Sequence, residues 1–365
     1  MSPERILHIV GSMDRAGAET MIMNLYREVD RQKFQFDFLC FGNKPGDYDS
    51  EIESLGGRIV RISAGNPIAR FFLLWKLLLR GHWQIVHSHT LWSSGLHLLA
   101  AKLAKIPRRI AHSHSTNSAH SGSAAGRSYE NTMRWLLSWV PTHYVACGKA
   151  AADYLFPSRT DVQLIPNAID IKTFINAQGY IVREELGIDK DRLVILQVGR
   201  LIPVKNHTYS IKVAAALRDS AVDFQMLFVG TGPEQQAVKA LVRQYKLEKY
   251  VRFLGLRADI PELMAAADVM LMPSLHEGFP VVLVESQAAG LPAVIATTIS
   301  PEVDLAMGLV EFISLDAAPP EWATRIQAAA QMTKVSAESR LQTLEHYGFS
   351  ARTGAQRLME VYKTT

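Results

Sequence analysis

The most informative chemical feature of the sequence is the segment 273–285, which contains two glutamates in the run PSLHEGFPVVLVE. This segment directly follows the apolar run Val269–Met272, which predicts a buried strand. The last residues of the segment predict the start of a helix. Glu277 and Glu285 are eight residues apart, which is roughly 12 Å along a helix. Paired carboxylates of glycoside hydrolases lie about 5–9.5 Å apart across one bond. The longer spacing favours a ligand that extends from a sugar through a diphosphate to a ribose.

The same segment predicts a binding site for an anion. Pro280 suits the first position of a helix, where the N–H group that proline lacks would have no partner. The free N–H groups of Val281 and Val282, together with the helix dipole, would then attract a negative charge. The alternative is a capped helix that carries two solvated glutamates.

A second segment, 199–206, carries two cations in the run GRLIPVKN and follows the apolar run Leu193–Val198. Arg200 offers a planar fork of donors and Lys205 a compact charge, and both suit a diphosphate. Such cations also stabilise the negative charge that develops on a leaving diphosphate. The alternative is a pair of surface bases beside a turn.

Short apolar runs alternate with segments of helix length along the whole chain, which is typical of parallel sheets with crossover helices. N-terminal strands are expected at Arg5–Val10, Phe36–Phe41, Arg58–Ile62, Gln84–His87, Arg109–His112, His143–Ala146 and Val162–Ile165. C-terminal strands are expected at Leu193–Val198, Gln225–Val229, Val251–Leu254, Val269–Met272, Ala293–Ala296 and Leu309–Ile313. The irregular segment from Pro166 to about Tyr180 separates the two sets and marks a domain boundary.

The predicted fold class is α/β, with two doubly wound, Rossmann-like domains that face each other across a cleft. Residues 1–168 would form the N-terminal domain and residues 169–349 the C-terminal domain. A C-terminal helix at about 350–365 is expected to pack back on the N-terminal domain. Because ligands bind beyond the carboxyl ends of the strands in open parallel sheets, the chemical residues should collect there.

Composition narrows the class of protein further. A chain of 365 residues suits two domains with full cores, and 48% hydrophobic residues exclude a disordered chain. Residues 1–168 carry 19 Lys and Arg against 13 Asp and Glu, whereas the remainder carry 20 against 22. The basic half suits anionic lipid or a phosphorylated ligand, and the absence of a dense basic run with interleaved aromatics argues against nucleic acid. Two cysteines, and neither a signal peptide nor a membrane-spanning run, predict a cytoplasmic protein.

The Gly-Arg-x4-Lys turn and the Glu-Gly-x-Pro-x4-Glu segment resemble those of the retaining, nucleotide-sugar-dependent glycosyltransferases of family 4, which have the GT-B fold. The resemblance extends to Gly-Ala-Glu at 17–19, Asn-Ala-Ile-Asp at 167–170 and Ala-Ala-Gly-Leu-Pro at 288–292. Within the family, the chain is most similar to bacterial exopolysaccharide and capsule enzymes. These have a similar opening at 7–13 and a similar Ala-His-Ser-His at 111–114.

This resemblance implies roles for the matching residues. Glu277 would contact hydroxyls of the donor sugar, and Glu285 would hold the ribose hydroxyls. Arg200 and Lys205 would bind the diphosphate, and His114 would lie against the donor sugar. The implied catalytic set is Glu277, Arg200, Lys205 and His114, and the implied donor-binding set is Gly17, Gly199, Asn206, Arg257, Gly278, Phe279, Pro280, Val281, Val282 and Glu285.

Two further positions qualify this assignment. Arg257, which follows Leu-Gly at the end of an expected strand, would lie near the base of the nucleotide. Ala16 stands before Gly17 where many relatives have two glycines, and its Cβ narrows the approach of the backbone to a phosphate. The Gly-Thr-Gly at 230–232 is expected to be only a strand-end turn near the nucleotide.

Four histidines end two neighbouring expected strands. His87 and His89 share one face of a strand, as do His112 and His114. Imidazoles are good metal ligands, but no carboxylate or cysteine joins this group. We therefore expect no metal and no cofactor, with one or two of these rings lining the cleft and the rest hydrogen-bonded within the domain.

The segment 71–79 has eight apolar residues in nine, and bases and tryptophan lie within the wider segment 70–82. One interpretation is a buried crossover helix of the N-terminal domain. The other is a helix that dips into the surface of the inner membrane, because acceptors in this branch of the family are often lipid-linked. The protein would then be cytoplasmic and peripheral to the membrane.

The expected activity is metal-independent transfer of a sugar, with retention, from a nucleoside-diphosphate sugar such as a UDP-sugar. The acceptor would be a glycan or a polyprenyl-linked sugar in bacterial surface polysaccharide synthesis. One alternative is a UDP-sugar 2-epimerase, which shares the fold and would release an epimer in the absence of acceptor. The other is a non-catalytic nucleotide-sugar-binding protein.

Overall fold

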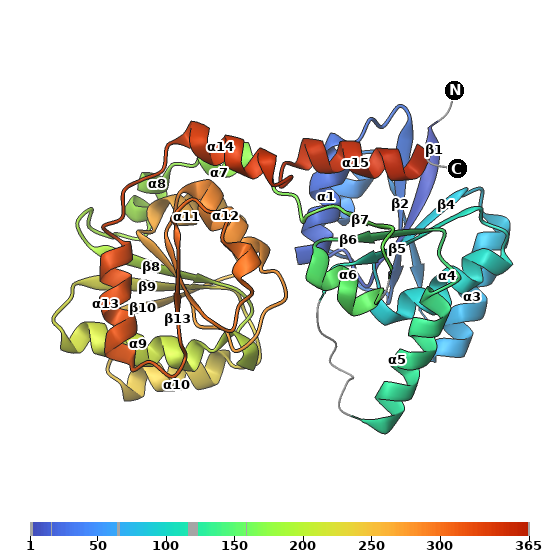
Figure 1. The fold of residues 1–365 in the computed structure, drawn as a ribbon. Coiled ribbons are helices and arrows are strands. Elements are labelled where there is room, and N and C mark those ends of the chain that lie inside the picture. The colour runs from blue at the N-terminus through green and yellow to red at the C-terminus, as the bar shows by residue number, and fades with distance from the viewer. Residues whose placement is uncertain (1–2, 16, 64–65, 116–122, 158, 364–365) are drawn as a thin grey trace. The chain divides into compact units, whose positions relative to one another are not determined.

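The computed structural model describes residues 3–15, 17–63, 66–115, 123–157 and 159–363. The chain forms two compact units, which are distinct in Figure 1. One unit runs up to Ile169 and resumes at Gly348, and the other comprises Asp170–Tyr347. The structure thus divides the chain after Ile169 and after Tyr347, where the sequence analysis placed the divisions after 168 and 349.

The first unit is built on a seven-stranded parallel sheet in the order β3-β2-β1-β4-β5-β6-β7. Its strands are β1 (Glu4–Ile9), β2 (Phe34–Phe41), β3 (Arg58–Ile62), β4 (Ile85–Ser88), β5 (Arg108–Ser113), β6 (His143–Ala146) and β7 (Val162–Leu164). Side chains alternate between the two faces of each strand, so Ile6 and Leu7 of β1 enter separate buried clusters. The sheet is therefore covered on both faces.

Helices of the first unit cover these two faces. They are α1 (Gly17–Glu28), α2 (Asp49–Ser54), α3 (Pro67–Arg80), α4 (Ser94–Leu103), α5 (Ala124–Leu137), α6 (Lys149–Leu155) and α15 (Ala351–Lys363), with a 3-10 turn, η1, at Leu91–Ser93. The C-terminal helix α15 packs beside α1, and its Leu358 and Tyr362 are buried in the cluster of Ile6. Helices α3, α4 and α5 pack in succession and form one layer (Figure 1).

The second unit has a six-stranded parallel sheet in the order β10-β9-β8-β11-β12-β13. Its strands are β8 (Leu193–Val198), β9 (Phe224–Val229), β10 (Val251–Gly255), β11 (Val269–Met272), β12 (Ala293–Ala296) and β13 (Val310–Ile313). Its helices are α7 (Ile171–Ile175), α8 (Gly179–Glu185), α9 (His207–Asp219), α10 (Gln235–Gln244), α11 (Ile260–Ala266), α12 (Val281–Ala289), α13 (Pro319–Ala329) and α14 (Ala337–His346), with 3-10 turns η2 (Pro203–Lys205) and η3 (Pro301–Val303).

These two sheets confirm the predicted fold class of two Rossmann-like, doubly wound units. The order of strands reverses between β1 and β4 in the first sheet and between β8 and β11 in the second. At such a switch point the loops that leave the two strands diverge, and a ligand can enter between them. The segment 199–206 follows β8 and the segment 273–280 follows β11, so both expected binding segments leave the switch point of the second sheet.

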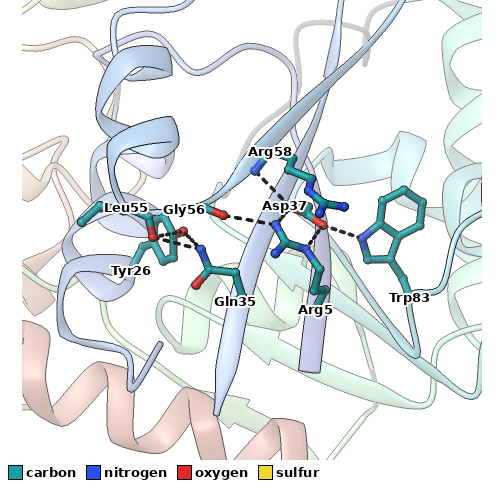
Figure 2. Close-up of polar contacts among 8 residues, drawn as sticks. All are labelled: Arg5, Tyr26, Gln35, Asp37, Leu55, Gly56, Arg58 and Trp83. Carbon is teal, nitrogen blue, oxygen red and sulfur yellow. Dashed lines mark hydrogen bonds and ion pairs between the residues drawn. The ribbon is translucent and has the colours of Figure 1, made fainter. Parts of the chain in front are cut away.

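A buried carboxylate ties together three strands of the first sheet (Figure 2). Asp37 on β2 is 1% exposed and forms a bidentate ion pair with Arg5 on β1, with Arg5 Nε donating at 2.8 Å. Trp83 Nε1 donates to the same carboxylate at 2.8 Å, and the backbone N–H of Arg58 on β3 donates at 3.0 Å. A buried charge is tolerated only when it is paired and hydrogen-bonded, so this carboxylate depends on all three donors.

We expect Asp37→Asn to lower the free energy of unfolding by about 3 kcal/mol, because it leaves an unpaired arginine beside a buried amide. The control is Asp30→Asn, which breaks a solvent-exposed pair with Lys33 and should cost less than about 1 kcal/mol. Urea denaturation followed by tryptophan fluorescence reports mainly on the first unit, which holds five of the six tryptophans. Equal losses in the two variants would contradict the proposed importance of Asp37.

Candidate functional site

The loop after β8 brings a lysine side chain against the backbone of a glycine. Gly199 has φ +152°, and a Cβ at this position would meet Lys205 Cε at 3.2 Å. A glycine here therefore leaves room for the Lys205 side chain to lie along the loop. The carbonyl oxygen of Lys205 accepts a hydrogen bond from Gln197 Nε2 at 2.9 Å, and Gln197 Oε1 accepts one from Ser210 Oγ at 2.6 Å. These buried amide and hydroxyl groups hold the loop in place.

The turn after β9 supports this loop through close backbone contacts. A Cβ at Gly230 would lie 2.2 Å from the carbonyl oxygen of Gly199, and a Cβ at Gly232 would lie 2.3 Å from that of Leu201. The N–H of Leu201 donates to the carbonyl of Thr231 at 3.0 Å. The glycines are thus required where two loops touch, a role that the sequence analysis did not assign to them. The Gly-x-Gly pattern directly after a predicted strand was the signal in the sequence that could have indicated this close contact of two loops.

An ion pair joins the loop after β8 to the loop after β11. Lys205 Nζ lies 2.7 Å from Glu277 Oε1, and both side chains are largely shielded from solvent. Two hydrogen bonds reinforce the junction: Leu275 N donates to Val204 O at 2.8 Å, and Asn206 Nδ2 donates to Pro273 O at 3.0 Å. The structure therefore brings together Lys205 and Glu277, which are separated by 72 residues in sequence.

The segment from Glu277 to Val282 lies beside this junction and leads into α12. Gly278, Phe279, Val281 and Val282 are half-buried. The helix begins at Val281, and Pro280 precedes it with ψ 104°, so the prediction that proline occupies the first helical position is wrong by one residue. An extended ψ at proline makes it the cap, and Leu283 N donates back to Pro280 O at 3.0 Å.

Glu285 lies in the second turn of α12. Burial removes water from its carboxyl group and raises the pKa of Glu285 to about 7. Val281 is four residues earlier on α12 and therefore lies on the same side of the helix. A carboxyl group with this pKa gains or loses a proton near neutrality, so a ligand that donates hydrogen bonds to it would favour the ionised form.

The two arginines of the predicted donor site have different surroundings. Arg200 is exposed and lies in the loop that follows β8. Arg257 pairs with Asp259 and with Glu185, with Nη1 2.8 Å from Glu185 Oε1 and Nη2 2.6 Å from Asp259 Oδ2. Hydrogen bonds to these carboxylates raise the pKa of Arg257. Its guanidinium is thus engaged within the second unit, and its contact with a nucleotide base stays a prediction.

Gly17 and His114 belong to the first unit. Gly17 begins α1, and open space surrounds the position that a Cβ would occupy there. Ala16, the departure from the family pattern, lies outside the described residues. His114 directly follows β5, and its Nε2 lies 2.8 Å from His89 Nδ1. Burial lowers the pKa of His114 to about 4, against a smaller opposing effect of Asn167.

Five histidines of the first unit lie close together, including His8, which the sequence analysis did not single out. Within the described residues, two groups of three histidines could each bind a metal ion, because one nitrogen from each ring lies within 4.8 Å of the other two. The groups are His8, His87 and His89, and His89, His112 and His114. The sequence-based expectation of no metal stays a prediction. His8 lies on β1 beside His87 of β4, so adjacency of strands, and not proximity in sequence, brings it into the group.

Helix α3 carries apolar residues on both its inner and its outer side, and only the inner side is buried. Leu74 and Leu78 are buried in the first unit, whereas Phe72, Leu73 and Leu79 are exposed. A crossover helix buries only the stripe that meets the sheet, which leaves the outer residues in solvent. None of the helices in the described residues has both the length and the apolar character needed to cross a bilayer.

Two doubly wound parallel units, each with a switch point at which the order of strands reverses, form the GT-B fold. The chain has the same fold as HepE from Anabaena, with a TM-score of 0.80 and 21% identity over 99% of this chain and 100% of HepE. Residues 15–173 match the family described as Glycosyltransferase Family 4, and residues 181–308 match Glycosyl transferases group 1.

Relatives in sequence agree with this assignment. The glycosyltransferase EpsF of Bacillus subtilis is 40% identical over 99% of this chain and 97% of its own length. The chain therefore belongs to glycosyltransferase family 4. A second relative, from Escherichia coli, is UDP-Gal:alpha-D-GlcNAc-diphosphoundecaprenol alpha-1,3-galactosyltransferase, which is 26% identical over 80% of this chain and 79% of that protein.

The raised pKa of Glu285 predicts a loss of stability as the pH rises. A carboxyl group whose pKa is higher in the folded state binds more protons folded than unfolded, so stability is lost between its unfolded pKa, about 4.5, and about 7. Glu285→Gln removes this titration. The variant should therefore melt a few degrees above the wild type at pH 8 and at nearly the same temperature at pH 4.

Thermal melts at the two pH values test this prediction. Glu248→Gln is the matched control, because Glu248 is an exposed glutamate of the same unit. A difference from the wild type that is the same at both pH values would mean that Glu285 does not titrate near neutrality.

Proposed function

We propose that the protein transfers a sugar, with retention at the anomeric carbon, from a UDP-sugar to a glycan or lipid-linked acceptor in the synthesis of a bacterial surface polysaccharide. The observation that carries this proposal is the Lys205–Glu277 pair at the switch point of the second sheet, with Glu285 in the next helix. HepE, which has the same fold, has been crystallised with UDP and with UDP-glucose. The relative from Escherichia coli is named for a UDP-sugar donor and a diphosphoundecaprenol acceptor.

In this proposal, the second unit holds the donor along one line. The diphosphate binds Arg200 and Lys205, because an exposed guanidinium and a partly buried ammonium leave the same loop. The sugar hydroxyls donate to Glu277, and the ribose hydroxyls donate to Glu285. Gly199, Asn206, Gly278, Phe279, Pro280, Val281 and Val282 shape the pocket around the diphosphate and sugar, and Arg257 lies toward the base.

The Lys205–Glu277 pair has a further consequence for the ligand. The negative charge of Glu277 already balances the positive charge of Lys205 before the donor binds. A diphosphate oxygen would share the ammonium with this carboxylate, and the three donors of a lysine permit both contacts. The same pair holds Glu277 beside the diphosphate, where the attached sugar must lie. The roles that the family resemblance implies for Gly17 and His114, which belong to the first unit, stay predictions.

The proposed chemistry is a front-side substitution. The acceptor oxygen forms a bond to the anomeric carbon on the face that the diphosphate leaves, and the bond between that carbon and the phosphate oxygen breaks. The acceptor's proton passes to the leaving phosphate oxygen. Arg200 and Lys205 stabilise the charge that develops on the diphosphate, and we propose that these two cations make a metal ion unnecessary.

A panel of UDP, GDP, ADP, CDP and dTDP in EDTA tests the proposed donor. UDP should raise the melting temperature by a few degrees, since a ligand at 100 times its Kd adds about 2.7 kcal/mol. Glu285→Ala should weaken UDP binding at least tenfold in calorimetry, because it removes the partner of two ribose hydroxyls. The control is Glu248→Ala, which should bind UDP like the wild type. Failure of every nucleotide to bind in EDTA would contradict the proposal of a metal-independent UDP-sugar enzyme.

We also propose that the first unit contacts the cytoplasmic face of the membrane through α3. Its outer side carries Ile68, Phe72, Leu73 and Leu79, which are 45–70% exposed. Arg70, Lys76 and Arg80 lie on the same helix, and neither α3 nor α4 contains an acidic residue. Exposed apolar side chains interspersed with bases fit the interface of an anionic bilayer.

Aromatic residues on and after α5, in the same layer of helices, add to this surface. Trp135 on α5 is 62% exposed, and its ring lies 5.3 Å from that of Trp139. Lys102 on α4 lies over the Trp139 ring at 4.1 Å. Tryptophan prefers the interfacial region of a bilayer, and lysine beside it adds attraction to anionic headgroups. A lipid-linked acceptor would reach the enzyme at this surface.

Flotation with phosphatidylglycerol vesicles tests the membrane contact. The double variant Phe72→Ser, Leu73→Ser should lower the bound fraction roughly tenfold, because it removes two apolar side chains that enter the bilayer when the protein binds. Leu256→Ser, which alters a 78% exposed leucine of the second unit, is the control. Unchanged binding of the double variant, or an equal loss in the control, would refute the contact.

A further inference from the structure

Five histidines of the first unit project from the sheet face that α15 covers. On each strand, an isoleucine enters the buried cluster beside α15: Ile6 on β1, Ile85 on β4 and Ile110 on β5. Each histidine follows one of these isoleucines by two or four residues, so it points to the same face of the sheet. His8, His87 and His112 are buried, and His89 and His114 are half-buried.

These rings and one tyrosine hydroxyl form a single unbranched line of contacts. From one end, His114 Nε2 lies 2.8 Å from His89 Nδ1, and His89 Nε2 lies 3.0 Å from His8 Nδ1. His8 Nε2 then lies 3.4 Å from the hydroxyl of Tyr362 on α15.

The line continues on the other side of this hydroxyl. It lies 2.9 Å from His87 Nδ1, and His87 Nε2 lies 3.2 Å from His112 Nδ1. Each of the four inner members thus has a neighbour on both sides, and no nitrogen is used twice.

Neutral rings in such a line cannot choose their tautomers independently. A neutral imidazole has one N–H donor and one acceptor nitrogen, and a hydroxyl has one proton to donate. Because every inner ring meets one neighbour with Nδ1 and the other with Nε2, a hydrogen bond at each contact requires the same tautomer throughout. The Tyr362 hydroxyl must accept from one histidine and donate to the other.

Burial keeps the rings neutral near physiological pH. It lowers the pKa of His8 to about 3 and that of His114 to about 4. The pKa values of the remaining three, His87, His89 and His112, also lie well below the usual value because of burial.

The distances favour hydrogen bonds over a metal site. Nitrogens that share a tetrahedral zinc ion lie about 3.3–3.4 Å apart, given zinc–nitrogen bonds near 2.0–2.1 Å. The contacts of His89 at 2.8 and 3.0 Å are shorter, and they use its two different nitrogens. Ligands of one ion would each direct a single nitrogen to a common point.

The end of the line at His114 indicates the direction of the hydrogen bonds. His114 Nδ1 and Asn167 Oδ1 are both buried without a hydrogen-bond partner among the described residues, and Asn167 interacts with the His114 ring. A carbonyl oxygen can only accept, so a proton on His114 Nδ1 suits Asn167. At the other end, His112 Nε2 would then be a bare acceptor, which is less costly to bury than an unpaired N–H group.

We propose that these six residues form one directional hydrogen-bonded line in which every histidine carries its proton on Nδ1, and that Tyr362 thereby fixes the proton of His114 on the nitrogen that faces Asn167. Nδ1 is the His114 nitrogen outside the line, so the tautomer set by Tyr362 of α15 is passed through His8 and His89 to this end.

Histidine-selective ¹⁵N NMR of the full chain in EDTA tests the line directly. In the wild type at pH 7, all five rings should show the Nδ1–H tautomer. Tyr362→Phe removes the shared oxygen, so the rings on its two sides should lose their common tautomer. Tyr144→Phe is the matched control, because it deletes another buried hydroxyl bond of the same unit, to Leu137 O at 3.0 Å.

Three results would overturn the line: different tautomers among the five wild-type rings, an Nε2–H tautomer throughout, or an unchanged pattern in Tyr362→Phe. Stoichiometric binding of zinc that shifts the resonances of these rings would also overturn it, because ligation takes the lone pairs that the hydrogen bonds use.

Discussion

The ion pair between Lys205 and Glu277 is the interaction on which the candidate site depends. It joins the loops that leave two adjacent strands, β8 and β11, at the point where the order of the sheet reverses. Backbone contacts of Gly230 and Gly232 hold one of these loops, and Asn206 ties it to the other. Because each charge is largely shielded from water, the pair holds its geometry without a ligand and directs a cation and a carboxylate to the same place.

Burial has opposite consequences for the other ionisable groups. Asp37 keeps its charge because an arginine, a tryptophan and a backbone N–H all donate to it. Glu285 lacks such a set among the described residues, so its pKa rises to about 7. The histidines beside α15 are neutral, and contacts between their ring nitrogens and with the Tyr362 hydroxyl link them. Structural groups are thus paired, whereas Glu285 remains able to respond to a ligand.

Much of the fold follows from local pattern. The thirteen strands of the described residues lie within two residues of the apolar runs that predicted them, because parallel strands buried on both faces must be apolar along their length. The site segments could be found for the same reason, since glycine, proline and charged residues directly after such a run indicate a loop at the carboxyl edge. Pro280 was misplaced by one residue because its ring is compatible with both the cap and the first turn.

The sequence by itself determined the class of protein, the two units and the two segments that leave the switch point of the second sheet. Tertiary structure alone decided which side chains meet. Nothing near His8 in sequence indicates His89 or Tyr362, which are 81 and 354 residues away. Likewise, Arg257 follows β10 and has a distant partner in Glu185 on α8, besides its neighbour Asp259. Such contacts depend on the order of strands and on the path of the chain, and these are properties of the folded molecule that local composition does not encode.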